Sequence, residues 1–383
     1  MKSATVVVIG AGAIGLAVAL QVRRAGIDGV VVVDTNPAPG MGSTSKANGG
    51  VRAQFSTPIN IEFSKYTVAG FAELDIRTKG QIGYRPIGYL FMTGTDVGVR
   101  GLRRAYELQR SMDVDVQWLT GPEALRKAPF VNPDRLFAAT YCAQDGVIDP
   151  HGVVTALWRE GNRLGVSYLF DTTVDGIDVA ANEVTVRAAA SRISAAFVVN
   201  AAGPRAASIA RLGGVELPVS NYRRNLACTE SVPGLPATIP MCVDVDTGVL
   251  IRREGAGVLI GFSDRADAPS EDTSFDPEYL VAIAARVGNR FPFLHDVAIN
   301  ERKCWAGLYP ETPDRQAVVG AVEGAPRFIQ CAGFGGHGIM HSLAAGHAVA
   351  ELIRDGRCTT FDISPLRVER FQGAGAAVET MVL

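Results

Sequence analysis

The sequence lacks several features that would assign it to a familiar class of protein. Its six cysteines include no CxxC pair and no zinc-like spacing, so we expect reduced thiols in a cytosolic (cytoplasmic) protein and no metal site. Its net charge of -2 gives no basic surface, so nucleic acid is not an expected partner. No uncharged apolar run reaches about eighteen residues, so no membrane span is predicted.

What the sequence does have is glycine, 42 residues of it, many in tight-turn motifs. Near the N-terminus a buried strand, TVVVIG, runs into a helix pattern over residues 14–25 and then into a second strand, VVVVD. Gly10, Gly12 and Gly15 stand at the first turn in GxGxxG spacing, and Asp34 ends the second strand. In a β-α-β unit such glycines admit a pyrophosphate at the helix N-terminus, and the acid binds a ribose. The unit predicts an adenine dinucleotide and leaves NAD and FAD both open.

Three later features favour FAD. The loop from Gly42 to Arg52 offers hydroxyls, an amide, a lysine and bare backbone soon after the acid, as a flavin and its ribityl chain require. A small-residue turn, Asn200 to Gly203, follows another strand. The glycine-rich stretch 333–338 precedes a helix whose positive end would face the flavin edge that gains charge on reduction.

Strand and helix patterns predict an α/β fold made of two interleaved domains. A Rossmann-like dinucleotide-binding domain is expected over three separated pieces, residues 1–85, 141–215 and 318–375. An α+β substrate domain built on an antiparallel sheet is expected over residues 86–140 and 216–317, where glycine turns join short strands. Residues 376–383 form a tail, and the final stretch GAGAAVETMVL is expected to be loosely held.

Three motifs carry a resemblance to a known family. GGVRAQFSTPIN, CWAGLYPETPDRQAVVG and CAGFGGHGIMHS are similar to segments of the D-amino-acid oxidase/sarcosine oxidase superfamily, above all to its branch of L-proline dehydrogenase and sarcosine oxidase β subunits. The resemblance runs from the first strand to about Phe371. It implies a GR2-type FAD domain, a separate substrate domain, and oxidation of a C–N bond in an amine or amino acid.

The glycine motifs and the resemblance together give the expected FAD contacts, which come mainly from turns and loops. Most of these residues are small, so contact through the backbone is expected. They are Gly10, Gly12, Ala13, Ile14, Gly15, Asp34, Thr35, Ser43, Thr44, Ser45, Lys46, Asn48, Gly49, Gly50, Val51, Arg52, Val174, Ala201, Ala202, Gly203, Gly333, Gly335, Gly336, His337, Gly338, Ile339 and Met340.

The sequence departs from the family pattern at two positions that bear on the flavin. Monomeric sarcosine oxidases bind flavin covalently through a cysteine, and Cys304 lies in the corresponding stretch. The more similar branch holds FAD noncovalently, which we expect here. Those oxidases also activate oxygen with a lysine, where this sequence has Leu259. Because a cation near the flavin favours superoxide formation, its absence favours a dehydrogenase.

The substrate side departs as well. The residues that bind the substrate carboxylate in the monomeric enzymes correspond to Phe55 and Met340, neither of which is charged. If the substrate is an amino acid, another cation must serve. Arg252, Arg253 and Arg315 are candidates, because a guanidinium fork matches a carboxylate.

The predicted function is FAD-dependent oxidation of the C–N bond of a secondary amine, an N-methyl or a cyclic amino acid. Hydride transfer to flavin N5 gives an imine that water hydrolyses. His337 and Tyr309 are expected in the active site, with Arg52 beside the flavin. The expected partners are a small-molecule substrate, an electron acceptor or oxygen, and, by resemblance, other subunits of a hetero-oligomer. Two alternatives stay open: a flavoprotein with mainly an assembly or binding role, and an NAD-dependent enzyme.

Overall fold

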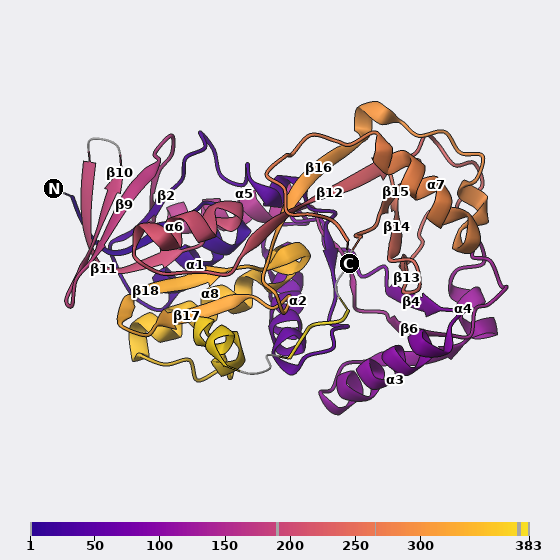
Figure 1. Ribbon diagram of the computed structural model, residues 1–383, viewed down its shortest axis with the longest axis horizontal. Helices are drawn as coiled ribbons and strands as arrows, with labels where there is room; N and C mark the ends of the chain where they lie inside the picture. The colour runs from indigo at the N-terminus through magenta and orange to yellow at the C-terminus, as the bar shows by residue number, and fades with distance from the viewer. Residues whose placement is uncertain (1, 189–190, 265, 374–376, 382–383) are drawn as a thin grey trace.

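Two large sheets dominate the structure. The computed structural model describes residues 2–188, 191–264, 266–373 and 377–381. Its strands form two eight-stranded sheets and a small ribbon of β3 (Gly50–Val51) with β7 (Gly146–Val147). Figure 1 shows the two large sheets next to each other along the long axis of the molecule, each with helices around it. The predicted α/β class is confirmed.

The first sheet is the Rossmann-like part. Its central path is β17-β18-β11-β1-β2-β8, and β10 and β9 continue from β11 as an antiparallel hairpin. β1 pairs in parallel with both β2 and β11, and its valines 6–8 are fully buried, as a central parallel strand requires. The bounds are β1 (Lys2–Ile9), β2 (Val30–Val33), β8 (Ser167–Leu169), β9 (Val174–Val179), β10 (Val184–Ala188), β11 (Ser191–Asn200), β17 (Val318–Val322) and β18 (Ala325–Ala332).

Helices from both ends of the sequence meet beside this sheet. A Cβ added to Gly346 would lie 2.7 Å from the backbone of Ala17, so the glycine lets α8 approach α1 closely. The N-terminal part of the chain and its last long helix therefore form one core. The helices here are α1 (Ala13–Arg24), α2 (Pro58–Arg77), α5 (Pro150–Arg163), α6 (Ala206–Leu212) and α8 (Gly338–Asp355).

The second sheet has the order β16-β12-β15-β14-β13-β4-β6-β5. Its neighbouring strands pair antiparallel except β4 and β13, which are parallel. Parallel pairing is possible there because these two strands are far apart in the sequence and no hairpin joins them. The bounds are β4 (Tyr89–Thr93), β5 (Val116–Thr120), β6 (Ala138–Cys142), β12 (Ser220–Cys228), β13 (Met241–Asp244), β14 (Val249–Glu254), β15 (Gly257–Gly261) and β16 (Trp305–Glu311).

The two faces of the second sheet have different neighbours. Ile251 and Ile260 point into a core with α4 (Gly121–Lys127) and α7 (Glu278–Arg290). Leu250, one residue away, belongs to another cluster with Phe91 of β4 and with α3 (Asp96–Ser111). Because strand residues alternate between faces, this second face is the one that can look toward the first sheet.

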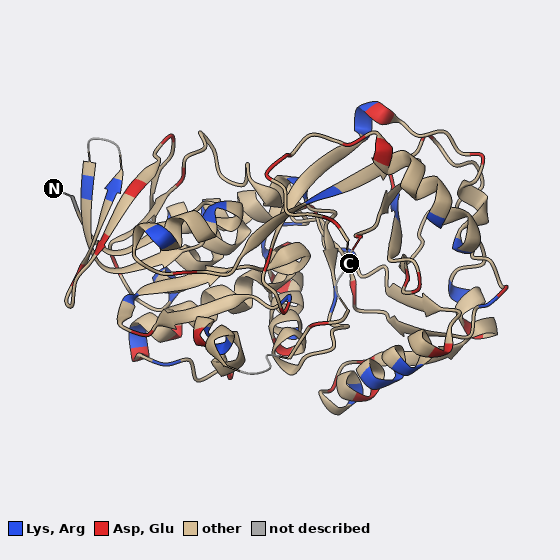
Figure 2. Cartoon of the chain, viewed as in Figure 1, with Lys and Arg blue, Asp and Glu red and all other residues tan. Residues whose placement is uncertain are grey.

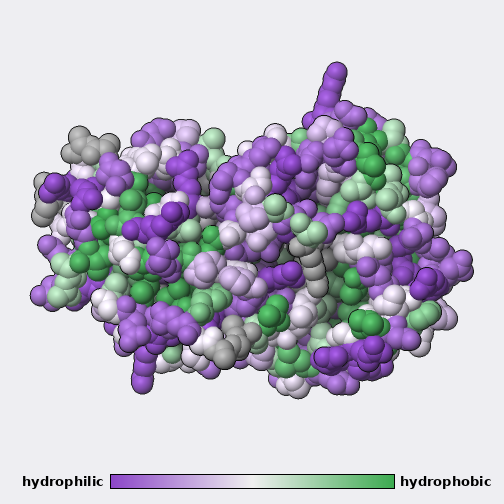
Figure 3. Space-filling model, in the orientation of Figure 1, coloured by the Kyte–Doolittle hydropathy of each residue, from purple (hydrophilic) through white to green (hydrophobic). Residues whose placement is uncertain are grey.

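The surface gives no strong pointer to a partner. Lys, Arg, Asp and Glu are spread over helices and loops (Figure 2), and the face in Figure 3 is mostly hydrophilic with smaller apolar areas. No helix in the described ranges is long and apolar enough to cross a membrane. Nor do the described residues bring together three side chains of the kind that bind metals.

Several expected elements are confirmed and one expectation is wrong. The helices predicted over 14–25 and 58–79 are α1 and α2, within two residues at each end. The final stretch is not loosely held where it is described, at 377–381, because Glu379 is fully buried and hydrogen-bonded. Residues 374–376 and 382–383 of that stretch lie outside the described residues. The domain boundaries stay a prediction, and β6 spans the one at residue 140.

Candidate active site

The glycine turn joins β1 directly to α1. Gly10 has a φ of 110°, and a Cβ there would lie 2.3 Å from the carbonyl oxygen of Ala201. A Cβ on Gly15 would lie 1.9 Å from the carbonyl oxygen of Gly10. Only glycine fits at these two positions, so the N-terminus of α1 packs closely against the ends of the strands. The Ala13 amide at that N-terminus donates to Thr44 Oγ1 at 3.1 Å, which brings the 42–52 loop to the turn.

The acid expected at the ribose lies beside this turn. Asp34 Oδ2 accepts a hydrogen bond from the Ala11 amide at 2.6 Å. The next residue, Thr35, shares a 2.7 Å hydroxyl hydrogen bond with Thr173, just before Val174 at the start of β9. The structure therefore brings Asp34, Thr35 and Val174 close together, and their contact with the adenosine stays a prediction.

A channel runs from the start of α1 to the start of α8, and we call it the glycine channel. Five segments far apart in the sequence line it; four of them contain predicted flavin contacts, and the fifth contains Tyr309, which was predicted for the active site. Of the other predicted contacts, Ser45 is turned to the Gly42 carbonyl and Val51 is buried in the core. The lining is Ala13, Ile14, Ser43, Thr44, Ala47, Asn48, Gly49, Gly50, Ala201, Gly203, Tyr309, Pro310, Cys331, Ala332, Gly333, Phe334, Gly335, Gly336, Gly338 and Ile339.

Between two glycines that line the glycine channel, the buried His337 has ring nitrogens that are unsatisfied in the described part of the chain. His337 is 3% exposed, and neither ring nitrogen has a hydrogen-bond partner among the described residues. Burial lowers the pKa of His337 to about 4, so the ring is neutral at physiological pH. A buried imidazole without partners is costly unless a ligand supplies them. The polar edge of a flavin ring is such a ligand.

The residues next to His337 form a buried cluster. Phe55 packs against His337 with ring centroids 5.6 Å apart, and the Arg52 guanidinium lies 3.9 Å from the Phe55 centroid. Met340 is 5% exposed in the core of α8. His341, which the sequence did not single out, packs against both His337 and Phe55, and its Nε2 shares a 2.9 Å hydrogen bond with Ser64.

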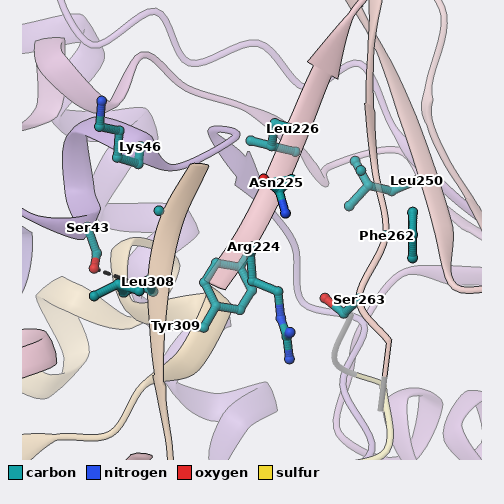
Figure 4. Close-up of a pocket in the computed structure, with 12 residues that line it drawn as sticks. Ser43, Lys46, Arg224, Asn225, Leu226, Leu250, Phe262, Ser263, Leu308 and Tyr309 are labelled. Atoms are coloured by element: carbon teal, nitrogen blue, oxygen red, sulfur yellow. Dashed lines mark hydrogen bonds between the residues drawn. The ribbon is translucent and has the colours of Figure 1, made fainter. Parts of the chain in front are cut away.

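A second cavity adjoins the glycine channel, and we call it the sheet cavity (Figure 4). Ser43 and Tyr309 line both spaces. Burial raises the pKa of Tyr309, so its phenol stays neutral. The sheet cavity is lined by Ser43, Lys46, Arg224, Asn225, Leu226, Leu250, Gly261, Phe262, Ser263, Gly307, Leu308 and Tyr309.

Arg224 of β12 is the buried cation that the sequence did not reveal. Its guanidinium lies 5.8 Å from the centroid of the Tyr309 ring, and Figure 4 shows the two side chains next to each other. It pairs with Asp267 at 2.6 Å and Glu311 at 3.3 Å. Its buried Nε has no partner within the described part of the chain. A donor remains for a ligand.

None of the three arginines proposed from the sequence lines either cavity. Arg252 donates to the Asn48 carbonyl at 2.8 Å and pairs with Glu254. Arg253 donates to the carbonyls of residues 235 and 236. Arg315 sits in the turn after β16, and neither it nor the other two is among the described residues that line the two cavities.

Two positions bear on flavin attachment and oxygen. Cys304 lines a separate surface cavity with Cys228 and Trp305, and burial raises its thiol pKa. Cys331 lines the glycine channel, but burial raises its pKa so far that the thiol is not a nucleophile. Leu259 is fully buried and packs with Leu226 and Cys228, so this position of the sheet carries no charge.

Asp145 is a buried acid that the sequence did not suggest. Its carboxylate accepts from the Ala53 amide at 2.7 Å and from Gln54 Nε2 at 3.0 Å. Burial raises its pKa to about 6, although hydrogen bonds and Arg52 oppose the rise. It lies in a loop that follows a strand, and the sequence there contains no recognisable motif.

A parallel β-α-β sheet with a glycine-lined channel beside a mostly antiparallel sheet defines a dinucleotide-binding oxidoreductase of the flavoprotein kind. The family model described as FAD dependent oxidoreductase (DAO) matches residues 5–352, and the chain belongs to this family. FAD is therefore its cofactor, and the NAD alternative is wrong. The resemblance seen in the sequence motifs is confirmed.

Individual relatives agree with the family. FAD-dependent oxidoreductase domain-containing protein 1 of Xenopus laevis is 28% identical over 97% of this chain and 83% of its own. Mitochondrial sarcosine dehydrogenase of Mus musculus is 26% identical over 93% of this chain but only 40% of its own. The crystal structure of L-proline dehydrogenase from P. horikoshii matches with a TM-score of 0.90 at 27% identity, covering 97% and 98% of the two chains. Glycine oxidase from Geobacillus kaustophilus, with a TM-score of 0.84 at 23% identity and covering 97% and 99%, shares the fold.

Proposed function

We propose that the protein oxidises the C–N bond of a secondary amine or an amino acid, with N-methyl and cyclic amino acids as the first candidates. The observation that carries this proposal is the adjoining of the two spaces: Tyr309 and Ser43 line both the glycine channel and the sheet cavity. A molecule in the sheet cavity would lie next to the cofactor. Relatives named for sarcosine and L-proline oxidation support the substrate class.

The chemistry needs little from the side chains beyond binding and orientation. FAD, when bound, would supply the two-electron acceptor: the carbon next to nitrogen would give up a hydride, which carries both electrons, while the nitrogen lone pair becomes part of a C=N bond. Arg224, through its free Nε, would hold a substrate carboxylate. The neutral Tyr309 phenol would orient the amine, and neutral His337 would donate to the flavin edge. Leu226, Leu250 and Phe262 are apolar walls that keep water out.

The electron acceptor is proposed to be a molecule other than oxygen. Leu259 stands where an oxygen-activating lysine is found in the similar oxidases, and it is buried among apolar side chains. FAD is proposed to be noncovalent, since Cys304 lines a different cavity and Cys331 is a protonated thiol. We also propose that the protein has further subunits and a cytosolic location.

The test is anaerobic titration of the purified, yellow protein with a panel of secondary amines and amino acids. We expect at least one N-methyl or cyclic amino acid to bleach the visible flavin band, with the imine's carbonyl product formed in equal amount. Tyr309→Phe should reduce the rate of bleaching while leaving the FAD content unchanged. If no amine bleaches a fully FAD-loaded protein, the flavoprotein with a mainly assembly or binding role becomes the better explanation.

A further inference from the structure

The segment 377–381 is bound tightly through a buried carboxylate. Glu379 is fully buried, and its two oxygens accept from five donors, more than the roughly four lone-pair sites of a carboxylate. These donors are the Ser56 amide (3.0 Å), the Ser56 hydroxyl, the Thr57 hydroxyl (2.8 Å), Asn60 Nδ2 (3.1 Å) and the Met381 amide (2.9 Å).

Glu379 occupies the N-terminus of α2. Thr57, the residue before that helix, makes no capping hydrogen bond with its own side chain. The carboxylate instead supplies the negative charge that a helix N-terminus favours. Burial raises the pKa of Glu379, but the hydrogen bonds more than offset it and leave the pKa below its usual value, so the group is charged.

The same segment holds Arg52. One terminal nitrogen of the guanidinium donates to the Met381 carbonyl and the other to the Gln54 carbonyl. Phe55 and Phe91 lie 3.9 Å and 5.3 Å from the guanidinium carbon, and Arg52 is 4% exposed. Each of the two terminal nitrogens that a ligand carboxylate would engage as a fork thus already gives one of its hydrogens to a backbone carbonyl.

The segment also borders the side of the molecule where the substrate is expected. Met381 packs against the cluster of Phe91, Met241 and Leu250, and Leu250 lines the sheet cavity. Figure 1 shows the end of the chain, in yellow, entering the middle of the molecule between the two sheets. The Glu379 amide donates to the Asp314 carbonyl at 3.1 Å, which ties the segment to the turn between β16 and β17.

We propose that the segment 377–381 is a specificity element that withholds Arg52 from anionic ligands. The Met381 carbonyl accepts a hydrogen bond from the guanidinium, and the Glu379 carboxylate supplies the negative charge that a ligand would otherwise bring. A substrate carboxylate is therefore left to Arg224 in the sheet cavity. The inference rests on the proposed function only in leaving the substrate carboxylate to Arg224; its own physical content is the anion affinity of Arg52.

The experiment measures binding of acetate to the FAD-loaded protein by calorimetry and by the shift of the flavin absorbance, with acetamide as the neutral probe of equal shape. Ending the chain after Gly373 removes the Met381 carbonyl and Glu379 together. We expect acetate to bind about tenfold more tightly or better, as a recovered charged hydrogen bond allows. Acetamide affinity should not change. Adding Arg52→Gln to the shortened chain should return acetate affinity to that of the full-length protein.

A second variant removes only the charge. Glu379→Gln keeps the size of the side chain, and we expect acetate to bind about threefold more tightly because one negative charge near Arg52 is lost. Glu351→Gln is the matched control. Glu351 is also a buried carboxylate with backbone donors, the amides of Thr359 and Thr360 at 2.9 Å each, but it lies toward the far end of α8. It should leave acetate affinity unchanged.

The outcomes separate this proposal from the proposed function. Unchanged acetate affinity in the shortened chain, or a gain that survives Arg52→Gln, overturns the specificity element. If the shortened chain does not fold, Glu379→Gln decides, and equal acetate affinity in it and in Glu351→Gln overturns the proposal. Tighter acetate binding together with no bleaching by any amine would uphold the specificity element and reject amine oxidation.

Discussion

The glycine channel and the sheet cavity meet at Tyr309 and Ser43, yet they are built from different material. Glycines and other small residues line much of the channel, so a ligand there meets mainly backbone. The sheet cavity is walled by larger side chains, among them Arg224, Leu250 and Phe262. Backbone positions are set by the fold, whereas side chains can be exchanged on the same fold. One scaffold can therefore keep a single cofactor while its substrate changes.

The strongest test of this contrast between backbone and side chains is a substitution at Gly15. A Cβ there would lie 1.9 Å from the Gly10 carbonyl oxygen, and neither backbone can move without separating α1 from β1. We expect Gly15→Ala to abolish FAD binding and to cost roughly 1–3 kcal/mol of folding stability. The FAD content after purification and chemical denaturation measure the two effects.

Gly42→Ala is the matched control, because a Cβ at Gly42 meets nothing within 4 Å. It should bind FAD as the unmodified protein does. Normal FAD content in Gly15→Ala would mean that the backbone of the glycine channel is less constrained than the structure indicates.

The next largest effect is expected at Arg224. Arg224→Gln should raise the KM for substrates that carry a carboxylate by roughly 10- to 100-fold, because a hydrogen bond to a charged group is lost. The KM for amines without a carboxylate should change little. Arg223→Gln serves for comparison, since that residue pairs with Asp272 at 2.7 Å and Asp276 at 2.6 Å instead. Equal effects of Arg224→Gln on both kinds of substrate would exclude its role as carboxylate ligand.

A smaller effect is expected at Leu259, which packs among apolar side chains where the similar oxidases have a lysine. Leu259→Lys should increase peroxide formation by about tenfold relative to dye reduction, because a cation stabilises developing superoxide. Leu259→Met keeps the site neutral and should behave as the unmodified protein. The preference for a dehydrogenase is wrong if the unmodified protein already forms peroxide as fast as it reduces dyes.

The smallest effect concerns Asp145. Its pKa is raised to about 6 in the folded protein, chiefly by burial. A raised pKa means that the stabilising contribution is complete below the unfolded value of about 3.9 and is lost as the pH rises through about 6. The melting temperature of Asp145→Asn relative to the unmodified protein should therefore increase by a few degrees between about pH 4 and about pH 7. Thermal unfolding at several pH values checks this, and a constant difference would contradict it.

The sequence was informative wherever function depends on local backbone. The β1–α1–β2 unit with its glycines and Asp34 lies within residues 2–34, and the structure brings the glycine turn and Asp34 together as expected. The later turns at 200–203 and 333–338 were also recognisable, because glycine and alanine follow a strand in each. Family resemblance then supplied the kind of chemistry.

The sheet cavity could not be predicted in the same way. Arg224 reaches it because β12 pairs with β16 in a register that sets Arg224 opposite Gly307, and no local pattern encodes that register. Arg252 and Arg253 were candidates because a guanidinium fork matches a carboxylate, but both donate to carbonyl oxygens instead. Glu379 was missed because an ending rich in glycine and alanine resembles a loose tail until its partners at the start of α2 are known.

The packing of α8 against α1 has a consequence for how the protein is made. The walls of the glycine channel come from residues near 10–50 and near 331–339, so the second wall leaves the ribosome long after the first. At roughly 5–20 residues per second the delay is on the order of a quarter of a minute to a minute. During that interval the nascent β-α-β unit exposes an incomplete site, and loading of the coenzyme is confined to the last stage of synthesis or to the released chain.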